Sequence, residues 1–172
     1  MNYKNRVLLL ISVLLLISIS YMPVYAHDEA RQSEYSCLME AVYFEAGNQP
    51  FVGKIAVAQV IINRVDSNRY PNTICGVVHE GPISEWWWDN HSKVVPIKWK
   101  CQFSYYCDGK EEEAFEGKNW NDSERAALMV MNGMINDVTE GATHYHADYV
   151  EPYWAKKMNR TVTIDNHLFF KR

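Results

Sequence analysis

Residues 37–65, CLMEAVYFEAGNQPFVGKIAVAQVIINRV, decide the plan of this chain. The pattern predicts two helices with a break between them. The first, over 35–46, ends at Gly47-Asn48, because glycine and asparagine readily adopt the left-handed conformation that stops a helix. The second begins at Pro50, which suits a first helical turn, and runs to about Val65. This second helix is apolar over much of its circumference, so we expect it at the centre of the core.

Glu45 ends an apolar stripe on the first helix. Leu38, Val42 and Glu45 are spaced i, i+4 and i+7, which places them on one face. Burial of that stripe would desolvate the carboxyl and raise its pKa, and an acid protonated near neutral pH can donate a proton to a glycosidic oxygen. The alternative is a last-turn residue in solvent. Glu40 lies about 140° away around the helix and cannot pair with Glu45.

The rest of the chain alternates helical and strand patterns. In order, it predicts a short turn or helix over 70–78, an irregular segment over 79–100, a strand over 102–106, a helix over 122–137, a strand over 143–149 and two short strands around 165–166. The predicted fold class is α+β, helix-rich with a small antiparallel sheet.

The N-terminus has the layout of a secretory signal peptide. Two basic residues precede an apolar run over 7–19, and small residues occupy the positions before a cut after Ala26. An uncleaved membrane anchor is the alternative, which Pro23 and nearby polar residues disfavour. We therefore expect residues 1–26 to be removed. Residues 27–172 then form a single exported domain, periplasmic or extracellular, with no membrane contact after cleavage.

Charge and cysteine content narrow the class of protein. Removing residues 1–26 takes away two cations and no anion, so the formal charge moves from −4 to −6, which argues against a nucleic-acid partner. The four cysteines (37, 75, 101 and 107) all follow the leader, and an even number in an oxidising compartment predicts two disulfides. A zinc site would need closer spacing. The pairing stays open, although a bend could bring Cys101 and Cys107 within bridging distance.

The stretch THYHADY, residues 143–149, offers a possible metal site. On a strand, His144, His146 and Asp148 would share one face, with Tyr145 on the other. Three such ligands could bind zinc, or the same face could line a groove. Same-face neighbours lie about 6.6 Å apart, so one compact ion would reach all three only if the backbone were distorted. We predict no metal and no cofactor.

Five sequence blocks, taken in order, resemble one known family. They are CLMEAVYFEAGNQPFVGKIAVAQVIINRV, YPNTICGVVHEG, CQFSYYCDGK, GATHYHADYV and TIDNHLFF, and together they span Cys37 to Phe170. In this order and spacing they resemble the cell wall hydrolase family typified by bacterial spore cortex-lytic enzymes.

The resemblance implies a lysozyme-like, lytic-transglycosylase-like domain that cleaves the glycan strands of peptidoglycan. The family's essential glutamate lies in a block that usually reads Y-x-E-A-R-G-E. Here the block is YFEAGNQ, which places the glutamate at Glu45 and replaces Arg-Gly-Glu by Gly-Asn-Gln. We therefore predict Glu45 as the catalytic acid of a monomeric enzyme. The resemblance also implies a set of sugar-binding residues: Gln102, Ser104, His144, Tyr145 and His146.

Two other functions remain open from the sequence. A hydrolytic muramidase or glucosaminidase would need a second carboxylate about 5 to 9.5 Å from the first, for which Asp108 is the best reserve. A non-catalytic glycan-binding module would use exposed indoles among Trp86, Trp87 and Trp88, because such rings stack on sugars.

Overall fold

The structure, a computed structural model, describes residues 29–110 and 116–172. It divides into a short N-terminal unit that ends at Ser33 and a larger unit, residues 34–172, which holds the core. The predicted signal peptide, residues 1–26, lies outside the described residues. Within the described residues, no helix combines the length and apolarity needed to cross a membrane.

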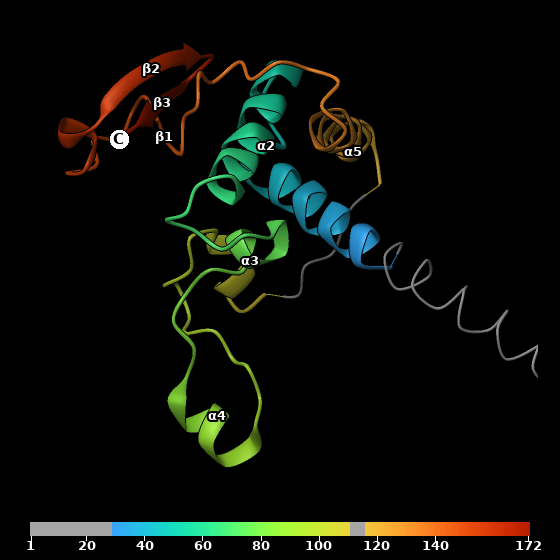
Figure 1. Ribbon diagram of the computed structural model, residues 1–172, viewed down its shortest axis with the longest axis vertical. Helices are drawn as coiled ribbons and strands as arrows, with labels where there is room; N and C mark the ends of the chain where they lie inside the picture. Colours follow the sequence, from blue (N-terminus) through green and yellow to red (C-terminus); the bar gives the residue numbers. More distant parts are fainter. Residues whose placement is uncertain (1–28, 111–115) are drawn as a thin grey trace, which may run out of the picture. The chain divides into compact units, whose positions relative to one another are not determined.

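The two helices of the opening stretch both form. One helix runs over residues 29–46, and α2 (Phe51–Val65) follows after Pro50, which takes the N-cap position instead of the first turn. Every residue from 53 to 61 in α2 is buried, which confirms its predicted central place. α2 packs against α5 (Lys118–Met131) and α3 (Ile74–Val78), and Figure 1 labels all three helices.

The helix predicted over 122–137 begins and ends earlier than expected. Ser123 does not cap it, because its hydroxyl lies inside α5 and donates to the carbonyl of Asn119 at 2.8 Å. At the other end, Asn132 and Gly133, whose φ of 65° is left-handed, stop the helix at Met131. Glycine adopts that conformation without steric cost, so the chain turns there.

Two predictions for the middle of the chain are wrong. Residues 102–106 form no strand; η1 (Ser104–Cys107) is a short 3-10 helix. A disulfide holds the Cα atoms of Cys101 and Cys107 at 6.1 Å, whereas six extended residues would span about 20 Å. The segment 79–100 is not wholly irregular, since it contains α4 (Glu85–His91), none of whose residues is buried.

The predicted C-terminal strands form a three-stranded antiparallel sheet. The strand order in the sheet is β1 (His144–Ala147), β3 (His167–Lys171) and β2 (Asn159–Ile164). The 3-10 helix η2 (Ala155–Lys157) comes just before β2 in the chain. Asp165, with φ of 51°, makes the turn between β2 and β3. Phe169 of β3 is fully buried against Ala56 and Val60 of α2, which fixes the sheet to the central helix. The α+β fold class is confirmed.

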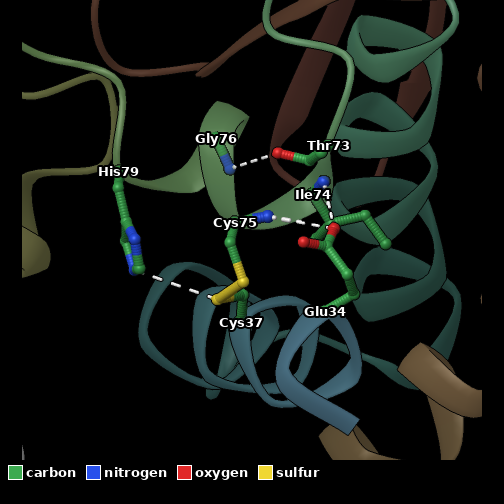
Figure 2. The surroundings of a disulfide bond; sticks show 7 residues. All are labelled: Glu34, Cys37, Thr73, Ile74, Cys75, Gly76 and His79. Atoms are coloured by element: carbon green, nitrogen blue, oxygen red, sulfur yellow. Dashed lines mark hydrogen bonds between the residues drawn. A yellow bond between two sulfur atoms is a disulfide. The ribbon is translucent and has the colours of Figure 1, made fainter. Parts of the chain in front are cut away.

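The four cysteines form the two predicted disulfides, Cys37–Cys75 and Cys101–Cys107. Figure 2 shows Cys37–Cys75 joining the helix over 29–46 to α3. Beside it, the Glu34 carboxylate accepts hydrogen bonds from the backbone N–H groups of Ile74 and Cys75, at the positive end of α3. This cluster therefore fastens α3 to the helix that carries Glu45.

We predict that the two disulfides contribute unequally to stability. Cys37–Cys75 closes a separation of 38 residues and Cys101–Cys107 one of 6. Loop-closure entropy then gives about 4 kcal/mol for the first and about 2 kcal/mol for the second. Urea unfolding of the two double alanine variants should show the larger loss for Cys37→Ala/Cys75→Ala. Equal losses would contradict the entropic account.

Candidate active site

Glu45 lies on the last turn of the helix over 29–46, at the end of a buried stripe. Leu38 and Val42 are fully buried, and Glu45 is partly exposed. Burial raises the pKa of the Glu45 carboxyl, while a hydrogen bond from Tyr145 and the positive charge of Arg64 act to lower it. The carboxyl therefore does not lie free in solvent, which was the alternative that the sequence left open.

Tyr145 is the direct partner of this carboxyl. Its hydroxyl donates to Oε2 of Glu45 at 3.1 Å, from a strand 100 residues further along the chain. The tyrosine ring packs against Phe169 and His167, with centroids 5.8 and 5.4 Å away, so its direction is fixed by the sheet. Burial and the nearby Glu45 carboxylate raise the pKa of Tyr145 well above its ordinary value, so the hydroxyl remains a donor.

Lys54 fixes the position of Glu45, and the sequence reasoning missed it. The side chain is 1% exposed, and Nζ donates to the carbonyls of Ala46 and Gly47 at 2.7 and 2.6 Å. A cation at the C-terminal end of a helix is also favoured by the helix dipole. Its only signal in the sequence is a lysine in the first turn of a helix that is otherwise largely apolar, where a buried charge needs a partner.

Arg64 is a second buried cation that was missed. It is 6% exposed, its Nε donates to the carbonyl of Thr143 at 2.8 Å, and its guanidinium lies 5.4 and 5.5 Å from the ring centroids of Tyr70 and Phe103. Arg64 thus connects α2 to the start of β1. Its charge also favours the ionised form of Glu45.

Two hollows share Glu45 as a wall. One, of about 300 Å³, is lined by Arg64, Gln102 and Tyr145 among others. The second, of about 430 Å³, is lined by side chains that include Tyr43, Asn119 and Tyr149. Among the described residues that line these two hollows, Glu45 carries the only carboxylate. One partly desolvated acid thus lies where two hollows meet, and we call the two hollows together the cleft.

The structure brings some of the predicted sugar-binding residues to this cleft. Gln102, His144 and Tyr145 line the 300 Å³ hollow with Glu45. Ser104 and His146 line neither hollow. Ser104 is exposed at the start of η1, and His146 stacks on Phe170 with ring centroids 5.1 Å apart.

Trp154 is a cleft residue with no signal in the sequence. It lines the hollow beside Glu45, and its ring lies 5.3 Å from His144 and 5.6 Å from His146. The two histidines share one face of β1, as predicted, and that face is covered by Trp154. In the described part of the chain, no three or more His, Cys, Asp or Glu side chains are placed to hold a metal ion.

The sequence profile of the cell wall hydrolase family matches residues 48–170. The chain belongs to this family. The match begins three residues after Glu45 and covers α2, the 101–107 loop and the sheet up to Phe170 of β3. This confirms the family that the five sequence blocks indicated.

Curated relatives of this chain are spore cortex-lytic enzymes. That of Bacillus cereus is 45% identical over 49 residues, 28% of this chain and 19% of the relative. That of Halalkalibacterium halodurans is 28% identical over 138 residues, 80% of this chain and 34% of the relative. The chain thus spans about a third or less of these relatives.

Two solved structures share the fold. The catalytic domain of the SleB protein of Bacillus cereus superposes with a TM-score of 0.59 at 28% identity, covering 81% of this chain and 91% of that domain. The catalytic domain of the germination-specific lytic transglycosylase SleB of Bacillus anthracis gives a TM-score of 0.55 at 28% identity, covering 81% and 95%.

We predict that Glu45 lowers the stability of the folded protein at neutral pH. The pKa of Glu45 in the folded state is raised above the ordinary 4.5, because burial favours the protonated form. The folded state therefore has its full stability below pH 4.5 as far as Glu45 is concerned, and it loses stability as the pH rises through the folded-state pKa. Glu45→Gln should therefore melt at a higher temperature than the parent at pH 7, with the difference vanishing toward pH 4.

Thermal unfolding across this pH range measures the effect. Glu151→Gln is the matched control, since it removes the same charge from an exposed ion pair with Lys156 and relieves no burial. A difference in melting temperature that is independent of pH would contradict the assignment of desolvation to Glu45.

Proposed function

We propose that this protein cleaves the glycan strands of peptidoglycan as a lytic transglycosylase, with Glu45 as its acid and base. The observation that carries the proposal is the geometry at Glu45. One desolvated carboxyl, hydrogen-bonded by Tyr145, lies between two hollows. The similarity to spore cortex-lytic enzymes and to a lytic transglycosylase domain supports the same reaction class.

In this mechanism a glycan strand occupies both hollows, with the bond to be cut beside Glu45. Protonated Glu45 donates its proton to the glycosidic oxygen as the bond to the anomeric carbon breaks. The resulting carboxylate then takes the proton of the muramyl 6-hydroxyl, whose oxygen bonds to the anomeric carbon and closes a 1,6-anhydro ring. The enzyme ends in its starting protonation state, and no water is consumed.

Tyr145 and Arg64 serve the second half of this cycle. Both stabilise the carboxylate form of Glu45, whereas burial stabilises the protonated form. These opposing contributions limit the rise in the pKa of Glu45, which suits a group that must give up a proton and then take one back.

Hydrolysis is less well supported, because it usually requires a second carboxylate about 5 to 9.5 Å from the first. Asp108, the reserve candidate, lines neither hollow. Its carboxylate accepts a hydrogen bond from the Lys110 backbone at 2.8 Å and pairs with the Lys110 ammonium at 3.5 Å. A single glutamate is sufficient for transglycosylation.

We assign the sugar contacts from the same cleft. Gln102, His144 and Tyr145 face the strand on one side of Glu45. Tyr149, which is 81% exposed, offers a stacking surface on the other. Ser104 and His146 remain proposed contacts that the two hollows do not include, and His146 would act by holding Trp154.

The proposed place of action is outside the cytoplasm. A leader over 1–26, a single domain over 27–172 and two disulfides are consistent with export to an oxidising compartment. No metal enters the proposed reaction, so lysis should be insensitive to chelators.

We predict that Glu45→Gln abolishes lysis of purified cell walls. The amide is nearly isosteric but cannot act as the acid, and general acid catalysis contributes about 10²- to 10⁴-fold. Turbidity loss measures the rates of the parent and the variant, and mass spectrometry of the parent's soluble products should show 1,6-anhydro ends. Products heavier by one water would instead show hydrolysis, and binding of cell walls without soluble products would indicate the glycan-binding module.

We predict that Tyr145→Phe moves the alkaline limb of the pH profile of kcat/KM to higher pH. The hydrogen bond from Tyr145 lowers the pKa of Glu45, so its loss raises that pKa and keeps the acid protonated further into the alkaline range. Tyr153→Phe, at a residue that is 82% exposed, is the control. An alkaline limb that stays in place or moves to lower pH would contradict this role.

A further inference from the structure

A third hollow, of about 450 Å³, adjoins the catalytic cleft and shares His144 with it. Three cationic side chains line it, those of Arg69, Lys171 and Arg172. Among the described residues of its wall, no aspartate or glutamate is present. We call this space the cationic hollow.

The fold brings these cations together from distant parts of the sequence. Arg69 lies in the loop after α2, and Lys171 ends β3. Lys171 is held by a hydrogen bond from Nζ to the carbonyl of Glu140 at 3.0 Å. The hydroxyl of Tyr70, which also lines the cationic hollow, lies 3.5 Å from Nε2 of His144, the residue that lines both spaces.

The pKa of His144 depends on burial and on the charges at this junction. Burial, followed by the positive charges of Arg64 and Arg172, lowers the pKa of His144 to about 4. The imidazole is therefore neutral in the physiological range and adds no charge of its own. Cationic side chains therefore gather at this junction, although the chain as a whole carries a formal charge of −4.

We propose that the cationic hollow is a subsite for a carboxylate borne by a muramyl residue of the strand that is cut at Glu45. The inference rests on the proposed function and names the part of the substrate that the cationic hollow binds. Arginine and lysine bind carboxylates through charge-assisted hydrogen bonds, and arginine can do so with two parallel bonds. The hydroxyl and acetamido groups of the glycan itself are uncharged and need no such cluster.

Two sources can supply that carboxylate. In peptide-bearing strands it belongs to the stem peptide attached to the lactyl group of the muramyl residue. In strands stripped of peptide, the lactyl group itself ends in a carboxylate. Because His144 belongs to both spaces, the same strand would contact Glu45 and the cationic hollow together.

The test is binding by an enzyme that cannot turn over. In a Glu45→Gln background, Arg69→Gln/Lys171→Gln should raise the Kd for soluble peptidoglycan strands by about ten-fold at low salt, and much less at high salt. Lys110→Gln/Arg160→Gln removes two exposed cations that line none of the three hollows and should leave Kd unchanged. Arg69→Glu alone is the second variant, because the Arg69 side chain can be changed without removing the Lys171 contact to Glu140.

Three ligands separate the outcomes: peptide-bearing strands, amidase-stripped strands and neutral N-acetylglucosamine oligomers. Weakening confined to peptide-bearing strands identifies a stem-peptide carboxylate, and weakening confined to stripped strands identifies the lactyl carboxylate. Weakening on both shows that the cationic hollow accepts either carboxylate. No weakening on either, or equal weakening on the neutral oligomer, overturns the proposal. If parental Glu45 enzyme fails to cleave while this pattern holds, the proposed reaction is wrong and the carboxylate subsite stands.

Discussion

The buried ammonium of Lys54 is the contact on which the active site depends. It belongs to the most buried helix of the molecule and binds the last carbonyls of the helix that carries Glu45. Desolvation by burial lowers the pKa of Lys54. A lysine in the core therefore stays charged only if it gains partners that offset this desolvation. The end of the Glu45 helix supplies those partners. The core therefore sets the place of the acid directly.

Glu45 is subject to the same opposition between burial, which disfavours its charged form, and polar partners, which favour it. Its helix supplies the apolar stripe that disfavours the charge, and β1 supplies the hydroxyl of Tyr145 that favours it. Because these come from parts of the chain 100 residues apart, the balance exists only once the sheet has packed on α2. The pKa of Glu45 therefore depends on the complete tertiary structure.

The cleft extends on both sides of this acid and changes character along its length. The 430 Å³ hollow is lined by amide and aromatic side chains, and the spaces beyond His144 become cationic. An asymmetric cleft of this kind can orient a polar, directional polymer. One disulfide joins α3 to the helix that carries Glu45 and the other closes the 101–107 loop, and no cysteine of the described residues lines the two hollows at Glu45.

The sequence by itself determined the local elements, because periodicity and stop signals are short-range: the helix pair of residues 37–65, the three strands, and the apolar stripe that leads to Glu45. Tertiary structure decided what no local pattern encodes. η1 replaced a predicted strand because a disulfide imposes a short distance on six residues. Trp154, the partners of Lys54 and the cations around Arg69 meet only through packing of distant segments, so single-residue chemistry could not place them.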